Sequence, residues 1–392
     1  MALFYHAIFL IVLVSATAGK FSKHTKKVSH GQGVEHQTKH VAPTKEDEPD
    51  DDVFDYKNDD KTTTNISTNS TRTKVIIDCD VGVDDAQAIM IALSQDSIEI
   101  LAITTVTGNQ NTEQATNNTL KVLDYCGERN IPVYKGITEG LTGDFVELSA
   151  YHGQDGLGDA QGLREPDRTP LKDKHAVLAM IDLVKANPGE ISILALAPLT
   201  NLAIAGRLDP TFLTNVKAVH MMGGNKHAVG NHLVTAEFNF GADPEAAHIV
   251  LNEFKCNMSL ITWEFTLENP MTWAWFDEYA AVNTTKGRFI YNITRHLKTF
   301  ENGGPYITCD PFTVAVAARP DIITKSKMVY LTVELDGRIT RGQVVVDWRG
   351  VMGKPPNVLL IENVDMSKFK RMMLDSVDAP RTIGGSRRSN YY

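Results

Sequence analysis

Cysteine is scarce in this chain of 392 residues, which contains four cysteines. They are too few and too widely spaced for a disulfide framework, and no two of them have the spacing of zinc ligands. The sequence therefore excludes a small disulfide-stapled protein. A single bridge between Cys126 and Cys256 stays an open alternative to free thiols.

Excess positive charge and long apolar runs are also missing. The formal net charge is −9, and residues 46–60 alone carry nine acids and one lysine, so the rest of the chain is close to neutral. A near-neutral body has no field to neutralise phosphates, and we expect no nucleic-acid partner. With 42% hydrophobic and 22% charged residues and no second long apolar run, the sequence predicts a globular protein and excludes a multi-pass membrane protein.

The N-terminal segment 1–18 is typical of a secretory signal. An apolar run at residues 7–14 is followed by Ala16 and Ala18, the small residues that signal peptidase accepts, although no lysine or arginine precedes the run. The run is too short to span about 30 Å of hydrocarbon, which disfavours the alternative of a membrane anchor. We therefore expect a secreted, extracellular protein without membrane contact. Six glycosylation sequons agree with that route: Asn65, Asn69, Asn117, Asn257, Asn283 and Asn292.

Residues 19–72 form a predicted disordered arm, and residues 379–392 a flexible tail. The arm is rich in lysine and histidine, then acidic, and has almost no apolar periodicity, so burial would not offset the entropy cost of ordering it. Its histidines suggest a metal-binding tract, but a solvated tail is favoured because the sequence offers no second ligand cluster. Within residues 46–60, Phe54 and Tyr56 lie among acids, which suggests contact with a basic host protein as an alternative to a plain acidic spacer.

Residues 73–378 alternate between short apolar runs and helical patterns, which predicts one α/β domain. Asp243 followed by Pro244 marks the start of one helix. This alternation is typical of a mostly parallel open sheet with helices on both faces, and such sheets bind ligands beyond the carboxyl ends of their strands. The predicted strands and helices cover residues 75–79, 86–93, 98–106, 115–126, 177–184, 191–197 and 216–222.

Four carboxylates follow the first apolar strand within eight residues. Asp78 and Asp80 should share a face of the strand, and Gly82 should let the chain turn so that Asp84 and Asp85 return at a helix N-terminus. Carboxylates stay ionised together only beside a cation or strong donors, and an all-oxygen cluster selects a hard ion such as Ca²⁺ or Mg²⁺. A solvated surface turn is disfavoured because the preceding strand is wholly apolar.

This octet, Asp78-x-Asp80-x-Gly82-x-Asp84-Asp85, resembles the signature of the calcium-dependent inosine-uridine-preferring nucleoside hydrolases. The resemblance continues in order along the chain to Asp310-Pro311 and covers about residues 74–376. With the predicted signal and sequons, the chain is similar among secreted members to the salivary purine nucleosidases of blood-feeding insects. The further motifs begin at Thr104, His152, Leu196, Met221, Ala236 and Asp243.

The resemblance implies a nucleoside hydrolase fold and a set of site residues. It implies that Asp80, Asp85, Asp310 and the carbonyl of Leu196 hold one Ca²⁺, with Asp80 as general base toward water. Oxygen-rich side chains also suit the positive charge that builds up on ribose when the N-glycosidic bond breaks. The family's contacts to the sugar match Asp84, Asn109, Met222, Asn231, Glu237 and Asn239. The implied partner is a small ribonucleoside, and the implied assembly is a homo-oligomer, a dimer or a tetramer.

Cys309 departs from the family pattern, which often places histidine before the last Asp-Pro pair. A thiol is a poor general acid for a departing base. His152 corresponds to a base-side histidine of the family, so the resemblance makes it the first candidate for that role, with a purely structural role as its alternative. A weak acid pairing favours purine over pyrimidine nucleosides, because a purine has N7 available for protonation. Two other readings remain: a phosphatase of the haloacid dehalogenase type with an Asp nucleophile, and a secreted binding protein that acts through its acidic arm.

Overall fold

The computed structural model describes residues 72–143 and 150–378. The predicted signal at 1–18, the arm up to residue 71 and the tail at 379–392 lie outside the described residues. The described chain begins with β1 (Thr73–Cys79) and ends with α12 (Met366–Asp378). Among the described residues, no helix is both long and apolar enough to cross a membrane.

A nine-stranded sheet forms the centre of the domain, in the order β4-β3-β2-β1-β5-β6-β7-β11-β8. Neighbouring strands are parallel except for β8, which runs antiparallel to β11 at one edge. A separate antiparallel pair joins β9 and β10. The prediction of a mostly parallel open sheet is therefore confirmed. The remaining strands are β2 (Ile98–Thr105), β3 (Val133–Lys135), β4 (Leu171–Lys172), β5 (Ile191–Ala195), β6 (Ala218–Met222), β7 (Asn257–Ile261), β8 (Ile323–Val329), β9 (Leu331–Val333), β10 (Val344–Val346) and β11 (Val358–Val364).

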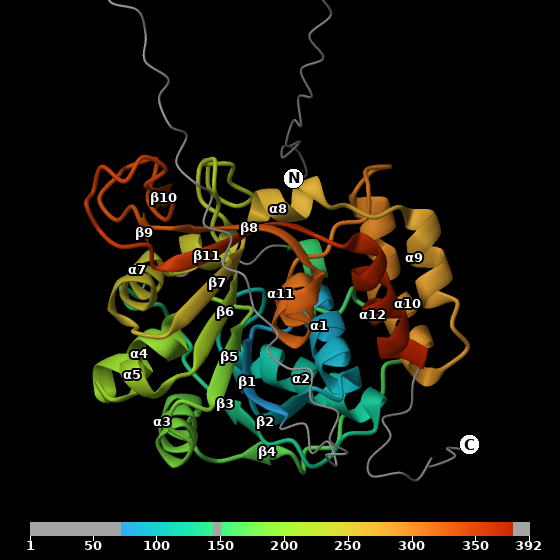
Figure 1. Cartoon of the computed structure of the whole chain (residues 1–392). Helices are drawn as coiled ribbons and strands as arrows, with labels where there is room; N and C mark the ends of the chain where they lie inside the picture. The colour runs from blue at the N-terminus through green and yellow to red at the C-terminus, as the bar shows by residue number, and fades with distance from the viewer. Residues whose placement is uncertain (1–71, 144–149, 379–392) are drawn as a thin grey trace, which may run out of the picture. The chain divides into compact units, whose positions relative to one another are not determined.

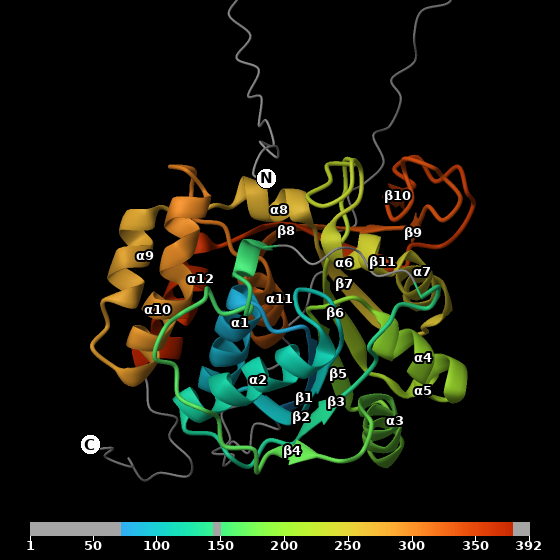
Figure 2. The ribbon, with the colours of Figure 1, turned by 180° about the vertical axis from the view of Figure 1, so that it is seen from behind.

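Helices cover both faces of this sheet (Figures 1 and 2), as the alternating pattern predicts. The group α1, α2 and α9 to α12 lies on one side, and α3, α4, α5 and α7 lie on the other. The helices are α1 (Val83–Ser94), α2 (Thr112–Cys126), α3 (Ala176–Ala186), α4 (Thr200–Leu208), α5 (Phe212–Asn215), α6 (Phe238–Ala242), α7 (Pro244–Glu253), α8 (Trp263–Glu268), α9 (Trp273–Ala280), α10 (Thr285–Phe300), α11 (Asp310–Ala318), and the short 3-10 turns η1 (Ala150–His152) and η2 (Pro320–Ile322).

Strand β1 shows why the sheet needs cover on both faces. Val75 and Ile77 point into one hydrophobic cluster, whereas Ile76 between them points into the other. All three are fully buried or nearly so. Side chains that alternate between two apolar clusters produce an uninterrupted apolar run, which is the pattern of a parallel strand buried on both sides.

Helix α7 also begins as predicted, because the Asp243 carboxylate caps it by accepting a hydrogen bond from Ala246 N at 3.0 Å.

The strand order changes direction at β1, which lies between β2 and β5. Connections from β1 therefore lead toward one edge of the sheet, and those from β5 lead toward the other. The loops after β1 and β5 separate at this point and leave room for a ligand at the carboxyl ends of the strands. The acidic octet follows β1, and Leu196 follows β5.

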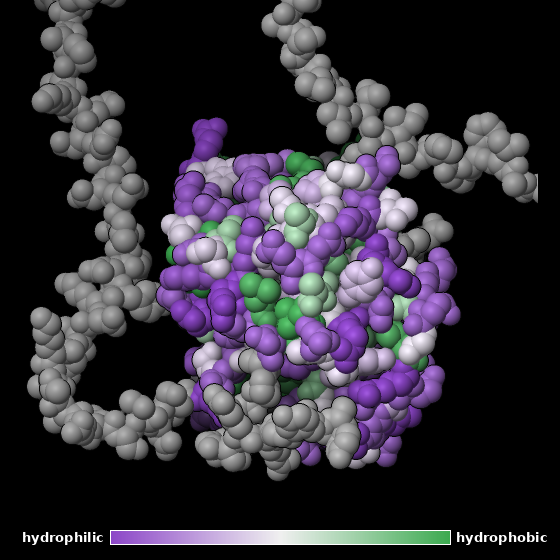
Figure 3. All heavy atoms as spheres, turned by 90° about the vertical axis from the view of Figure 1, so that its right-hand side faces the viewer, coloured by the Kyte–Doolittle hydropathy of each residue, from purple (hydrophilic) through white to green (hydrophobic). Residues whose placement is uncertain are grey.

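Figure 3 shows the face formed by α9, α10 and α12, where hydrophilic side chains predominate and small hydrophobic patches lie between them.

The four cysteines are free thiols. Cys126 packs against the hydrophobic cluster on one face of the sheet, and Cys256 packs against the cluster on the other face. The structure therefore places no bridge between them.

Candidate active site

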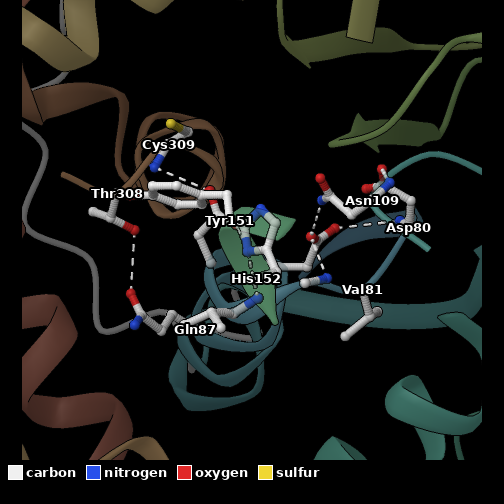
Figure 4. A network of polar contacts seen from close by, with 12 residues as sticks. Asp80, Val81, Gln87, Asn109, Tyr151, His152, Thr308 and Cys309 are labelled. Carbon is white, nitrogen blue, oxygen red and sulfur yellow. Dashed lines mark hydrogen bonds and ion pairs between the residues drawn. The ribbon is translucent and has the colours of Figure 1, made fainter. Parts of the chain in front are cut away.

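The turn after β1 brings Asp80 and Asp85 together. The Asp85 carboxylate accepts hydrogen bonds from Gly82 N at 2.8 Å and from Asp80 N at 3.3 Å, so it closes the turn at the N-terminus of α1. Asp80 Oδ2 accepts a hydrogen bond from Asn109 N at 2.5 Å, and Asn109 Nδ2 donates to Asp85 Oδ2 at 3.3 Å. Figure 4 shows Asn109 beside Asp80 at this corner. The loop after β2 thus fixes both carboxylates.

Asp310 joins this corner from a segment more than 200 residues away. It is the first residue of α11, and one oxygen each from Asp84, Asp85 and Asp310 lie within 4.8 Å of one another. Asp80 and Asp310 influence each other electrostatically, although Asp80 is not part of that triplet. The structure therefore brings together the predicted ligands Asp80, Asp85 and Asp310. It adds Asp84, predicted as a sugar contact, to the cluster.

Burial and mutual repulsion act on these acids. Burial raises the pKa of Asp80 well above its usual range, and the negative charge of Asp85 raises it further. Burial likewise raises the pKa of Asp310, with repulsion from Asp84 and Asp85 adding to the effect. The pKa of Asp85 rises to about 7, mainly through burial and then through Asp84. Asp80, Asp85 and Asp310 are therefore fully ionised together at neutral pH only if positive charge is supplied nearby.

Two buried oxygens support a cation at this place. Asp80 Oδ1 and Asp84 Oδ1 are buried and have no hydrogen-bond partner within the described part of the chain. Hard oxygen ligands of this kind suit Ca²⁺ or Mg²⁺. The carbonyl oxygen of Leu196, the fourth predicted ligand, accepts a hydrogen bond from Asn239 Nδ2, a predicted sugar contact, at 3.0 Å. The donor set fits a divalent cation.

Three predicted sugar contacts converge at the end of β6. Asn239 Nδ2 donates to Met222 O at 3.1 Å as well as to Leu196 O. The Glu237 carboxylate accepts from Gly224 N at 2.6 Å and from Asn239 N at 2.9 Å, so it caps α6 and holds the strand end. Burial raises the pKa of Glu237 to about 7. These contacts use most of the lone pairs of the oxygens involved, so few remain to accept from a sugar hydroxyl. They also fix the direction in which the remaining lone pairs point.

Asn231 differs from the other predicted sugar contacts because it lies exposed in the loop between β6 and α6. That loop is held at its base, where the buried Glu264 carboxylate accepts from Lys226 N and His227 N, both at 2.8 Å. The structure does not bring Asn231 into the buried cluster. Its role as a sugar contact stays a prediction.

His152 lies on the opposite side, against the first turn of α1. Its Nδ1 accepts a hydrogen bond from Val83 N at 3.1 Å and is 3.8 Å from Asp84 Oδ1. Burial lowers the pKa of His152. Because Nδ1 accepts from a backbone amide, the neutral imidazole carries its proton on Nε2. The ring is therefore arranged as a donor through Nε2 at neutral pH.

Cys309 also adjoins Asp84, through its backbone. Cys309 N donates to Asp84 Oδ2 at 3.3 Å. Burial raises the pKa of the thiol well above its usual range, with Asp84 adding to the shift. A thiol that is harder to deprotonate is also a weaker acid, so the side chain of Cys309 is poorly suited to protonate a leaving base.

The expectation that Asp78 joins the other carboxylates is wrong. It is not part of the acidic triplet, and its Oδ1 accepts instead from Thr104 Oγ1 at 2.6 Å and from Asn201 Nδ2 at 2.8 Å. Burial raises the pKa of Asp78 to about 7. Asp80 follows the end of β1, so strand alternation no longer fixes its direction relative to Asp78. Asn201 is a buried link between β1 and α4 rather than a ligand.

Two groups near the site have no motif that reveals them. Tyr151 packs edge-on against His152, with ring centroids 5.0 Å apart, and its hydroxyl bonds to the Glu301 carboxylate. Gln87 links α1 to the segment before Asp310, as Figure 4 shows. Gln87 interrupts an apolar helical run in the sequence, which is the only signal that marks it.

Comparison with known proteins agrees with this geometry. The family model for inosine-uridine preferring nucleoside hydrolases matches residues 75–371. The Leishmania major enzyme of that description is 36% identical over 309 residues, covering 78% of this chain and 97% of that protein. A pyrimidine-specific ribonucleoside hydrolase of Escherichia coli is 34% identical over 307 residues, 76% of this chain and 94% of that protein.

A solved inosine-guanosine nucleoside hydrolase has the same fold. It superposes with a TM-score of 0.73 at 35% identity, covering 78% of this chain and 98% of that chain. The matched relatives hydrolyse nucleosides, and the match includes every element that carries the acidic cluster. The chain therefore belongs to the inosine-uridine preferring nucleoside hydrolase family, and it is an enzyme that cleaves the N-glycosidic bond of ribonucleosides.

Proposed function

We propose that this protein hydrolyses purine ribonucleosides to ribose and free base with Ca²⁺ as its metal and Asp80 as general base. The observation that carries the proposal is the convergence of Asp84, Asp85 and Asp310. Asp80 is joined to this cluster through its backbone bond to Asp85, and its buried Oδ1 has no partner among the described residues. Asp80, Asp85, Asp310 and the Leu196 carbonyl would hold the ion. When bound, Ca²⁺ supplies positive charge that keeps these acids ionised and makes a neighbouring water more acidic.

Asp80 suits the role of general base because one of its oxygens is fixed and the other is not. Oδ2 is held by Asn109 N, which orients the carboxylate, while Oδ1 has no partner among the described residues. A free, oriented carboxylate oxygen accepts a proton from water as the water attacks the anomeric carbon. The ribose then carries positive charge in the transition state, which the surrounding acids favour over the neutral ground state.

The same site also contains the residues that would contact the sugar. Asp84, Asn109, Glu237 and Asn239 would accept from or donate to the ribose hydroxyls, with Met222 packed near the ring and Asn231 joining from its loop. A deoxyribonucleoside would leave such buried polar groups unpaired, so the site should discriminate against it.

The base preference rests on His152 and Cys309. A purine has N7 available for protonation, and the Nε2 proton of His152 is a better source than the thiol of Cys309. The described relatives include both purine-acting and pyrimidine-acting enzymes, so the family alone does not choose between the two. The inosine-guanosine enzyme supports the purine assignment by likeness.

A substrate panel tests this proposal. Purified protein with Ca²⁺ is incubated with inosine, guanosine, adenosine, uridine, cytidine and 2′-deoxyinosine, and free base and ribose are quantified separately. We expect equal amounts of base and ribose, at least tenfold faster release from a purine than from uridine, and little release from 2′-deoxyinosine. Faster release from uridine would overturn the purine assignment. Phosphate release from a nucleoside monophosphate without ribose would instead favour the Asp-nucleophile phosphatase.

We also propose secretion through the signal at residues 1–18 and a homo-oligomeric assembly. Asn257 and Asn283 are exposed, which is compatible with glycosylation there. The likeness to salivary purine nucleosidases and contact of residues 46–60 with a host protein stay predictions. Expression in a secreting eukaryotic cell, with mass spectrometry of the medium before and after deglycosylation, tests the route; retention of the intact N-terminus inside the cell would contradict it.

A further inference from the structure

Gln87 is a fully buried amide in a helix whose neighbouring side chains are apolar. Its Oε1 accepts hydrogen bonds from Tyr306 Oη at 2.8 Å and from Thr308 Oγ1 at 3.1 Å. Its Nε2 donates to Thr294 Oγ1 on α10 at 3.3 Å. All four side chains are buried. Because an amide oxygen has two lone pairs, both are used in this network, and burial makes each bond costly to lose.

The network joins the two separate parts of the acidic cluster. Gln87 follows Asp85 by two residues on α1, whereas Tyr306 and Thr308 shortly precede Asp310 in the chain. Figure 4 shows the bond between Gln87 and Thr308, next to Cys309. The Tyr306 backbone is also paired with Met271 through two hydrogen bonds of 2.9 Å, which anchors the start of this segment. Gln87 thus fixes the end of the segment that carries Asp310 against the helix that carries Asp84 and Asp85.

The hydrogen bonds of Gln87 oppose the electrostatic repulsion between Asp310 and the neighbouring acids. Asp310 is buried near Asp84, Asp85, Asp80 and Glu237, each of which disfavours its negative charge. Without a cation, each of these acids that loses its proton would push the Asp310 segment away from α1. Neutral hydrogen bonds are unaffected by that repulsion and act within a low-dielectric interior, where they are strong. A site held in its binding geometry beforehand binds a ligand more tightly, because less ordering is left to the binding step.

We propose that Gln87 is a positioning residue that holds Asp310 against Asp84 and Asp85, so that the cation site is assembled before the cation binds. This inference rests on the metal site of the proposed function. Gln87 itself touches neither substrate nor cation. Its contribution should therefore appear in the affinity for the cation rather than in the chemical step once the site is saturated.

The test compares Ca²⁺ binding to full-length protein stripped with EDTA, by isothermal titration calorimetry. Gln87→Met keeps the length of the side chain but removes its polar atoms, and we expect about tenfold weaker Ca²⁺ binding, the equivalent of about one hydrogen bond. Tyr306→Phe, which removes one of the two hydroxyl donors, should give a smaller loss. With saturating Ca²⁺, kcat of the Gln87→Met enzyme should stay within about twofold of the wild type.

A matched pair of variants separates positioning from general stability. Gln87→Met leaves the Tyr306 and Thr308 hydroxyls unpaired, so its melting temperature in EDTA should fall. The triple variant Gln87→Met, Tyr306→Phe, Thr308→Val removes those unpaired hydroxyls and should regain much of that stability. We expect the Ca²⁺ affinity of the triple variant to stay about tenfold below that of the wild type. Thr119→Val, which removes a buried hydroxyl bond to Ala115 O on α2, should lower stability without changing Ca²⁺ affinity.

The outcomes distinguish this inference from the proposed function. If the wild type binds no Ca²⁺, the metal site of the proposed function fails, and the positioning role fails with it. If the wild type binds Ca²⁺ and Gln87→Met binds it equally well, the positioning role alone is wrong. Recovery of Ca²⁺ affinity together with stability in the triple variant would also contradict it, because the network would then act only through packing.

Discussion

Gly108 lies so close to Asp80 that a β-carbon at position 108 would be 2.0 Å from Asp80 Oδ2. The same β-carbon would be 2.9 Å from Pro198 Cδ, so the backbone has no free space on that side. Gly108 precedes Asn109, whose backbone amide holds Asp80 Oδ2. The loop after β2 therefore approaches the Asp80 carboxylate this closely because residue 108 has no side chain.

Gly108→Ala should displace the Asp80 carboxylate or the Asn109 amide and lower kcat/KM for inosine by at least a hundredfold. The reason is that a misplacement of about 1 Å in a reacting group costs on the order of a hundredfold in rate. Steady-state kinetics check this, with circular dichroism to verify folding. Gly241→Ala in α6 is the matched control, since its β-carbon would meet its nearest neighbour at 3.4 Å. Equal activity of the two variants would contradict the role of Gly108.

Removing divalent cations should destabilise the protein near neutral pH. A cation that binds the native cluster and not the unfolded chain adds about 2.7 kcal/mol to the free energy of unfolding at 100 times its dissociation constant. Differential scanning calorimetry at pH 7 in EDTA and in Ca²⁺ measures the difference as a shift in melting temperature. Asp85→Asn, which removes one charge from the cluster, should abolish most of the shift. A Ca²⁺-dependent shift of equal size in that variant would argue against the cluster as the binding site.

His152→Ala and Cys309→Ala should have unequal effects on the release of a purine base. Loss of a general acid typically costs 10²- to 10⁴-fold, so we expect kcat for inosine to fall by about a hundredfold in His152→Ala. Cys309→Ala should change kcat by less than about threefold, because its contact with Asp84 is made by the backbone amide and survives the substitution. Measured kcat values for inosine decide between the two residues. A large loss in Cys309→Ala alone would assign the proton to the thiol.

The half-buried His220 on β6 should make stability fall as the pH is lowered. Its Nδ1 is 2.8 Å from Ser259 Oγ, and burial lowers the pKa of His220 to about 4. The unfolded chain binds this proton near pH 6.5, so between pH 6.5 and 4 the unfolded state holds more protons and is favoured. The contribution of the neutral His220 to the free energy of unfolding is complete above about pH 6.5, and about 2 kcal/mol of it is lost by pH 5.

Urea unfolding at pH 7 and pH 5 checks the role of His220. Acids such as Asp78 and Glu237 have raised pKa values and act in the opposite direction, so the wild type alone does not isolate the effect. His220→Gln removes the titrating group at similar size. The wild type should lose about 2 kcal/mol more than the variant between the two pH values, and an equal loss in both would refute the assignment.

The sequence predicts the elements that carry the site because they are regular and local. An apolar strand ending in acids predicts β1 and the turn into α1, and Asp243 with Pro244 predicts the start of α7. Alternation of strand and helix signals then predicts parallel strands and the edge where the acids lie. The family resemblance supplies Asp310, whose spatial neighbours no local pattern reveals.

What the sequence does not predict depends on distant contacts. Asp78 turns toward Thr104 and Asn201, a partner 123 residues away. Gln87 bonds to Tyr306, 219 residues later, and no periodicity connects them. The antiparallel edge strand β8 and the pair β9 and β10 also follow from tertiary pairing, because their short runs carry no signal of direction.

The most direct test of the account measures ribose and hypoxanthine released from inosine by wild-type protein and by Asp80→Asn, each in Ca²⁺ and in EDTA. We expect equimolar ribose and hypoxanthine from the wild type in Ca²⁺, loss of turnover in EDTA that added Ca²⁺ restores, and at least a thousandfold slower release by folded Asp80→Asn. Full turnover in EDTA, or turnover by Asp80→Asn close to that of the wild type, would contradict it.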